Sequence, residues 1–162
     1  MTLSSIQIHK LAPEHVKSVR MMIQELADFE KMPTGPKLTE EKLIEDLEKG
    51  HFFGFIALKG DEPAGMALCY LAYSTWEGVF LHMEDLYVRP QFRKHGLGRL
   101  LVVRVCQEAV EKGYKRVEWS VLDWNPARKF YEKLGATNMS SAEGWLSYRL
   151  APEAIENVAN SG

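Results

Sequence analysis

Three long β-type segments that follow one another directly limit the folds open to this chain. They are FFGFIAL (52–58), PAGMALCYLAY (63–73) and VFLHMEDLYV (79–88), and a KGDE turn joins the first two as a hairpin. Helical patterns flank them at 13–29 and 39–50, and again at 98–112 and 126–134. Shorter strand patterns occupy 6–11, 116–122, the region of Asn138, and 145–150. A doubly wound dinucleotide fold alternates strand and helix throughout, so this order instead predicts an α/β (α+β) fold with a mixed, mostly antiparallel sheet flanked by helices.

Length and composition predict a single domain over residues 1–162, with residues 151–162 as a frayed tail. Hydrophobic residues make up 46% of the 162 residues and charged residues 26%, which is typical of a soluble globular protein. The formal net charge of -2 gives no general attraction to nucleic acid or to an anionic membrane. No signal peptide and no run of about 20 apolar residues is visible. We therefore expect a cytoplasmic protein without nucleic-acid or membrane partners.

The cysteines and histidines indicate neither a disulfide framework nor a metal site. The two cysteines form no Cys-x-x-Cys pair, and Cys106 lies in a valine-rich run where a small buried hydrophobe is expected. No two of the five histidines have the i, i+4 spacing of a helical metal site. His82, two residues before Glu84, is expected to be structural.

The segment between the third long strand and the next helix, Arg89–Arg99, has the composition of a phosphate-binding turn. Gly96 and Gly98 permit a tight turn and close backbone approach at the start of a helix. The N-terminus of a helix attracts phosphate, and Arg93, Lys94 and Arg99 supply countercharge. The segment is neither a Walker loop nor the Gly-x-Gly-x-x-Gly dinucleotide motif. The alternative is a solvated basic turn whose glycines serve geometry alone.

Arg93, Gly96 and Gly98 form the pattern Arg-x-x-Gly-x-Gly, which resembles the pyrophosphate-binding signature of the GNAT superfamily of acyl-CoA-dependent N-acetyltransferases. Residues 125–135 resemble the second CoA-contacting segment of that family. Segments 73–76, 82–88, 121–125 and 143–145 resemble the branch that holds the spermidine/spermine and thialysine Nε-acetyltransferases. The polyamine enzymes carry an acidic residue at the position of Ser74, so the resemblance is stronger to the thialysine enzymes.

The resemblance implies that acetyl-CoA is the co-substrate and indicates which residues contact it. They are Leu86, Tyr87, Val88, Arg93, Lys94, His95, Gly96, Leu97, Gly98, Arg99, Asn125, Ala127, Tyr131 and Lys133. Asn125 precedes a proline at the start of a predicted helix, so it can equally act as the N-cap of that helix. The spacing from Asn125 to Tyr131 is one residue shorter than in the branch, which leaves the contacts of Ala127 and Arg128 open.

Acetyl transfer to an amine needs a neutral amine, a polarised thioester carbonyl and a proton for the leaving thiolate. A lysine-like amine of pKa ~10.4 is about 0.04% neutral at pH 7, so a nearby carboxylate is needed as base. Glu84 and Asp85 are adjacent on a strand, and alternation sends their side chains to opposite faces unless a bulge intervenes, so one of them should face the acceptor groove. The resemblance favours Glu84 as the base and Tyr131 as the general acid. The alternatives are a structural ion pair for Glu84 and a core aromatic for Tyr131.

The resemblance also implies an acceptor groove and a homodimer. The groove residues are Phe29, Glu30, Trp76, Glu84, Glu143 and Trp145, whose acidic and aromatic side chains suit an ammonium group. Trp145 can equally pack in a strand. The expected acceptor is the primary amine of a small molecule, thialysine or a lysine-like amine. A polyamine acetyltransferase and a non-catalytic CoA-binding module are the alternatives. The sequence does not indicate what holds the α-carboxylate of an amino-acid acceptor.

Overall fold

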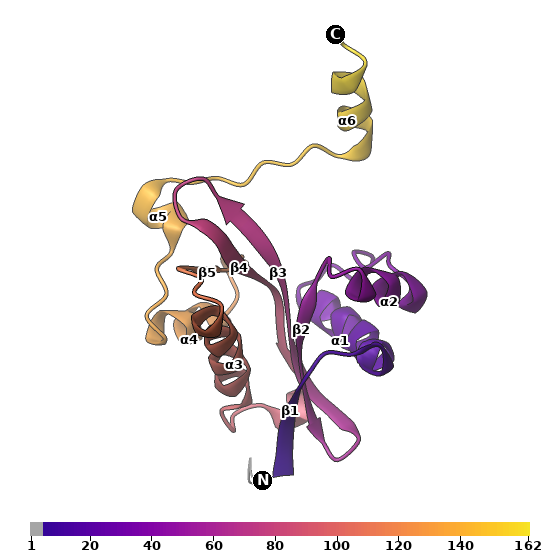
Figure 1. The fold of residues 1–162 in the computed structure, drawn as a ribbon, viewed down its shortest axis with the longest axis vertical. Coiled ribbons are helices and arrows are strands. Elements are labelled where there is room, and N and C mark those ends of the chain that lie inside the picture. The colour runs from indigo at the N-terminus through magenta and orange to yellow at the C-terminus, as the bar shows by residue number, and fades with distance from the viewer. Residues whose placement is uncertain (1–4) are drawn as a thin grey trace. The chain divides into compact units, whose positions relative to one another are not determined.

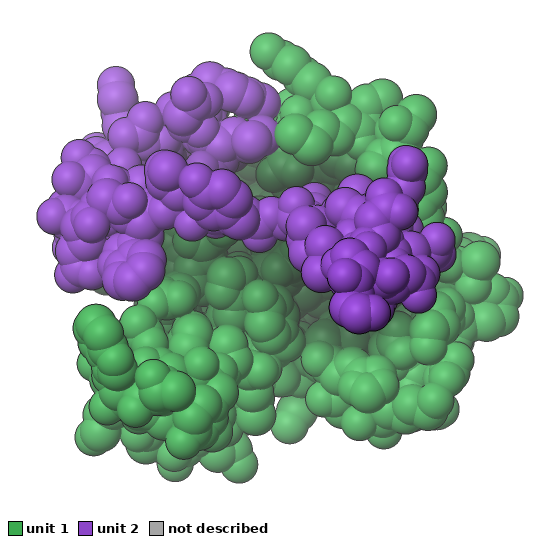
Figure 2. All heavy atoms as spheres, turned by 90° about the horizontal axis from the view of Figure 1, so that it is seen from above, with its two compact units in different colours: residues 1–120 green, residues 121–162 purple. Residues whose placement is uncertain are grey.

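The structure is a computed structural model that describes residues 5–162. The chain divides into two compact units, residues 1–120 and residues 121–162, which Figure 2 shows in different colours. No helix within residues 5–162 has both the length and the apolar composition that spanning a bilayer requires.

The first unit is built on a five-stranded sheet with the order β1-β2-β3-β4-β5. The strands are β1 (Ile6–Lys10), β2 (Phe53–Lys59), β3 (Glu62–Ser74), β4 (Gly78–Val88) and β5 (Val117–Glu118). The first three pairings are antiparallel, and β4 pairs with β5 in parallel. This confirms the predicted mixed, mostly antiparallel sheet. The strand predicted over 116–122 is reduced to two residues, because pairing with β4 ends after Glu118.

Helices cover both faces of the sheet (Figure 1). A 3-10 turn (η2, Pro13–His15) leads into α1 (Val16–Phe29), and α1 and α2 (Glu40–Glu48) lie on one face. A second 3-10 turn (η3, Pro90–Phe92) precedes α3 (Leu97–Glu111) on the other face. The Thr39 hydroxyl accepts a hydrogen bond from the Lys42 N–H at 3.2 Å, so α2 begins at the cap that the sequence predicts.

The apolar side chains of these layers pack into a continuous core. The α1 side of the sheet buries Leu11, Val19, Met22, Ile56, Met66, Leu68 and Tyr87 as one cluster. On α3, Leu101 and Val105 are fully buried. Cys106 on the same helix is exposed, contrary to expectation, while Cys69 in β3 is buried. Cys106 directly follows Val105, so the turn of the helix carries its side chain away from the sheet.

The second unit contains only helices within residues 121–162. They are α4 (Ala127–Lys133), α5 (Met139–Glu143) and α6 (Pro152–Ala159). The predictions of a strand near Asn138 and of another over 145–150 are wrong. Asn138 caps α5, and residues 145–150 form no strand, because a strand needs a partner along its edge and this unit offers none. Residues 152–159, expected to fray, form α6.

Candidate functional site

The N-terminus of α3 presents unpaired backbone donors in a basic surrounding. The first helical hydrogen bond runs from the Leu100 N–H to the Gly96 oxygen at 3.1 Å, so the N–H groups of residues 97–99 precede it. No side chain caps this end. Lys94 (φ 67°) and Gly96 (φ 81°) both adopt the left-handed conformation and turn the chain into the helix. Backbone donors, the helix dipole and exposed cations together suit an anion.

Gly98 leaves room beside those donors. A Cβ added at this position would meet only Val88 Cγ2 at 3.7 Å, which is ordinary van der Waals contact. Its φ lies outside the left-handed range, so neither packing nor backbone conformation requires glycine there. The open space over the first turn of α3 is therefore available to a ligand that approaches the backbone closely.

Arg93 is fixed across the end of β4. Its Nε donates to the Val88 oxygen at 2.7 Å, and its guanidinium carbon lies 5.5 Å from the Tyr87 ring and 5.7 Å from the Phe29 ring. Phe29, predicted from the resemblance as an acceptor residue, therefore lies against a residue predicted for CoA. Lys94, His95 and Arg99 are exposed around the same turn.

One edge of β4 carries a row of backbone groups that pair with no strand in the described part of the chain, although the Val88 oxygen accepts Arg93 Nε. On the β3 side, pairing continues to the end of the strand, where Val88 lies opposite Gly65. On the other side, β5 pairs only with Leu81 and His82. In the described part of the chain, residues 83–88 therefore have no strand partner on that edge. An extended ligand can bind such an edge as an added strand would.

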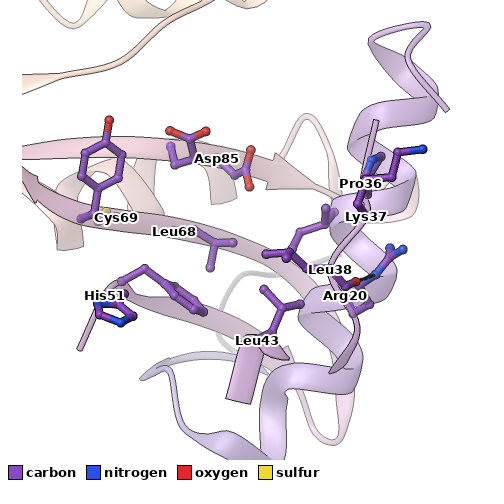
Figure 3. A pocket seen from close by; sticks show the side chains of 13 residues that line it. Arg20, Pro36, Lys37, Leu38, Leu43, His51, Leu68, Cys69 and Asp85 are labelled. Carbon is purple, nitrogen blue, oxygen red and sulfur yellow. Dashed lines mark hydrogen bonds between the residues drawn. The ribbon is translucent and has the colours of Figure 1, made fainter. Parts of the chain in front are cut away.

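A β-bulge brings both strand carboxylates to one pocket. Leu68 pairs with Asp85 and Cys69 pairs with Met83, so Glu84 is an extra residue in β4. The two acids are not separated by alternation, because a bulge, the one exception to the predicted alternation, interrupts it here. Glu84 and Asp85 both line a pocket of about 270 Å³ on the side of the sheet that carries α1 and α2 (Figure 3).

The two carboxyl groups differ in their surroundings. Burial, with smaller contributions from the charges of Glu84 and Glu30, raises the pKa of Asp85 from 3.8 to about 7. The Glu84 side chain is 62% exposed, and one of its oxygens lies 3.7 Å from Nε2 of His82. The His82 ring in turn stacks on Tyr70, another pocket residue, with ring centroids 4.7 Å apart. The pocket therefore holds one carboxyl that titrates near neutrality and a second one in contact with solvent.

The other acceptor residues predicted in this unit lie outside the pocket lining. Burial raises the pKa of Glu30, whose charge acts on Asp85. Trp76 is 86% exposed in the turn between β3 and β4. The Ser74 hydroxyl accepts hydrogen bonds from the N–H groups of Trp76 and Glu77 at 3.2 and 3.3 Å, so this serine shapes the turn. Within residues 5–162, no three His, Cys, Asp or Glu side chains are grouped as a metal site requires.

The second unit holds the remaining predicted residues. Asn125 Oδ1 accepts the Ala127 N–H at 2.9 Å and so satisfies a backbone donor at the start of α4, whose N-cap position is Pro126. Tyr131 lies on α4 with its ring centroid 5.2 Å from that of Phe130, and Lys133 is the last residue of the helix.

After α5, Trp145 Nε1 donates to Glu143 Oε2 at 2.8 Å. These two predicted acceptor residues are thus paired with each other, and both are exposed.

Residues 20–136 match the family described as Acetyltransferase (GNAT) family. The chain belongs to this family. The match begins within α1, covers the β-bulge and the basic turn, and ends after α4. The family match therefore shows that this protein is an acetyltransferase.

Similarity to known acetyltransferases extends over almost the whole chain. A thialysine Nε-acetyltransferase of Caenorhabditis elegans is 46% identical over 159 residues, which cover 98% of the chain and 99% of that protein. The thialysine Nε-acetyltransferase of Mus musculus is 34% identical over 97% of the chain and 99% of its own length.

Solved structures share the fold. An integron cassette protein of V. cholerae aligns with a TM-score of 0.78 at 22% identity, over 97% of the chain and 99% of that protein. An aminoglycoside N-acetyltransferase in complex with CoA aligns with a TM-score of 0.71 at 20% identity, over 90% of the chain and 94% of that protein.

Several pocket residues of this GNAT acetyltransferase escaped sequence reasoning. Asp85 stood beside Glu84, but a pattern of period two does not show that both reach one pocket, because the bulge that brings Glu84 to the side of Asp85 is seen only in the register of β3 and β4. Arg20 and Lys37 also line the pocket, one from α1 and the other from the loop before α2. A polar residue on an amphipathic helix is expected to face solvent, which hides the role of Arg20, and no sequence pattern specifies the path of the loop that carries Lys37.

Proposed function

We propose that this protein transfers the acetyl group of acetyl-CoA to the primary amine of a lysine-like small molecule, with thialysine as the first candidate. The observation that carries the proposal is the convergence of Glu84 and Asp85 in one pocket, on the stretch of β4 whose edge is open. The similarity to two thialysine Nε-acetyltransferases supports the choice of acceptor.

The features of the first unit fit coenzyme A. The N–H groups of residues 97–99, the space at Gly98 and the surrounding cations would hold the diphosphate. The β4 edge at residues 86–88 would hold the pantetheine amides as an added strand. Asn125, Ala127, Tyr131 and Lys133 remain proposed contacts from the second unit. When bound, acetyl-CoA supplies the thioester acetyl group.

The carboxylates bind the acceptor ammonium and receive its proton. An acid–base group works best when its pKa lies near the operating pH. Glu84, in contact with solvent, can take the proton directly or through water, while Asp85 titrates near neutrality and strengthens the local negative charge. Thialysine eases this step, because its thioether sulfur withdraws electrons from the terminal amine and lowers the pKa of that amine relative to lysine.

We propose Tyr131 as the group that donates a proton to the leaving thiolate. A thiol has a pKa of about 8.5 and tyrosine about 10, so the phenol acts mainly by a hydrogen bond that strengthens as charge develops on the thiolate.

We also propose that residues 1–162 work as one acetyltransferase domain. The family match, which crosses from residue 120 to 121, supports this.

We further propose a homodimer that functions in the cytoplasm. The end of the β3–β4 hairpin exposes a group of large apolar side chains, which is typical of a protein–protein contact. They are Leu71, Tyr73, Trp76 and Val79. Light scattering after size-exclusion chromatography tests the dimer: a single peak at 18.5 kDa, the mass of one chain, would contradict it.

An acceptor panel tests the function. Purified protein is given acetyl-CoA and thialysine, lysine or spermidine, and free CoA is measured over time. We expect the highest kcat/KM for thialysine, then lysine, then spermidine. A strong preference for spermidine would favour a polyamine acetyltransferase. Calorimetric binding of acetyl-CoA without turnover of any amine would favour a non-catalytic module.

A further inference from the structure

The pocket beside Glu84 and Asp85 carries charges of opposite sign on its two walls. The carboxylates project from β4, whereas Arg20 projects from α1 and Lys37 from the loop that precedes α2. Figure 3 shows Asp85 on the strand side and both cations on the helix side. A ligand that fills the pocket therefore meets negative charge at one end and positive charge at the other.

The lining between the two charged ends is apolar. It consists mainly of Ile23, Leu38, Leu43, Phe52 and Leu68. Such a surface suits a chain of methylene groups or a thioether, because burying apolar atoms there needs no hydrogen-bond partners.

Hydrogen bonds to uncharged groups hold the Arg20 side chain in place without neutralising its charge. Its Nε donates to the Leu38 oxygen at 2.9 Å, and one terminal nitrogen lies 3.5 Å from Gln24 Oε1. A guanidinium has five N–H donors, so these two contacts leave donors for a ligand. The bond to Leu38 also ties the loop of Lys37 to α1, as does the bond from Gln24 Nε2 to the Pro33 oxygen at 2.8 Å.

Within residues 5–162, no Asp or Glu forms an ion pair with Arg20 or Lys37, and the Lys37 side chain makes no hydrogen bond. Two adjacent cations without a counter-ion, at the wall of a pocket, form a favourable place for a carboxylate.

We propose that Arg20 and Lys37 bind the α-carboxylate of an amino-acid acceptor whose side-chain amine lies at Glu84 and Asp85. This rests on the proposed function and deepens it. The pair makes the pocket selective: thialysine and lysine place a carboxylate against the cations, whereas a polyamine has no carboxylate and brings positive charge toward them. Repulsion of the second ammonium thus opposes polyamine binding.

The test compares two acceptors that differ by the carboxylate alone. Bis(2-aminoethyl) sulfide is thialysine without its carboxylate, with the same chain length and the same thioether. kcat/KM is measured for both acceptors with the wild-type protein, with Lys37→Gln and with Lys37→Glu. Lys17→Gln is the matched control, because Lys17 is an exposed lysine of α1 outside the pocket lining.

We expect Lys37→Gln to lower kcat/KM for thialysine roughly tenfold, the size of one lost charge-assisted hydrogen bond, through a higher KM. The sulfide should lose nothing with Lys37→Gln and should gain with Lys37→Glu. Lys17→Gln should leave both acceptors unchanged. Because Lys37 makes no hydrogen bond or ion pair within the described residues, thermal melting should show all variants folded.

Two results would overturn the proposal in distinguishable ways. If the wild-type protein acetylates thialysine and the sulfide with equal kcat/KM, and Lys37→Gln lowers both alike, the carboxylate is not recognised here, although the proposed function stands. If the wild-type protein acetylates neither acceptor nor lysine, the proposed function itself fails.

Discussion

The substitution Asp85→Asn removes a buried carboxyl group whose ionised form lowers the stability of the folded protein. A pKa raised from 3.8 to about 7 means that the folded state binds this proton more tightly than the unfolded state. The protein therefore loses stability as pH rises from about 4 to about 7, and the loss is complete above that range. A difference of about three pKa units, at 1.36 kcal/mol each, sets a ceiling of about 4 kcal/mol.

We expect Asp85→Asn to be more stable than wild type at pH 8, by up to about 4 kcal/mol, with an advantage that shrinks as pH falls toward 5. Urea denaturation at pH 5, 6, 7 and 8 measures this difference. Asp61→Asn is the control, because Asp61 is exposed in the β2–β3 turn and asparagine suits a turn equally well. In parallel, the pH profile of kcat/KM should lose its inflection near neutrality in Asp85→Asn alone.

The reasoning is refuted if Asp85→Asn is less stable than wild type at pH 8 and the two free-energy curves stay parallel between pH 5 and 8. That outcome would mean that the folded protein stabilises the Asp85 carboxylate instead of burying it at a cost. A stability gain at pH 8 with an unchanged pH profile of kcat/KM would leave the burial argument intact and remove Asp85 from acceptor chemistry.

Three further variants test the proposed roles. Gly98→Ala should stabilise α3 by about 0.5–1 kcal/mol, since alanine is the better helix former, yet weaken acetyl-CoA binding in calorimetry; unchanged affinity would mean that the space at Gly98 is not used. Tyr131→Phe should lower kcat with little change in the Kd of acetyl-CoA, and a large rise in Kd with normal kcat would reassign Tyr131 to binding. Glu84→Gln should lower the rate most at low pH, and a pH–rate profile of unchanged shape would discard Glu84 as the base.

Much of the fold was predictable because local chemistry and tertiary structure agree. Thr39 caps α2 in the structure as its position before a glutamate-rich helix predicts. The glycine turn leads into α3 as expected, because Gly96 adopts the left-handed conformation that turns the chain into the helix. β2 and β4 carry enough β-branched and aromatic residues to be found from sequence alone, and β3, which has no β-branched residue, is found from the hairpin turn that precedes it.

The failures occur where a segment's structure depends on a partner. Residues 145–150 (WLSYRL) alternate as a strand does. A segment with this pattern becomes a strand only if it pairs with the edge of another strand, and the sequence does not show whether such an edge is available. Residues 116–122 are strand-like throughout, yet only Val117 and Glu118 pair with β4. Lys37 contributes to the pocket through the path of its loop, and no pattern in the sequence specifies that path.

The bulge in β4 does have a signal in the sequence, because two adjacent acids in a central strand conflict with regular alternation. A regular strand at residues 83–87 would turn Asp85 toward α1 and Glu84 toward α3. The face packed against α3 is lined by buried residues such as Leu101 and Val105, where an unpaired carboxylate costs several kcal/mol. An extra residue relieves that conflict by letting Glu84 leave the alternation and reach the same side as Asp85. Adjacent acids in a strand between two helical layers therefore predict a bulge, and with it a pocket that holds two carboxylates.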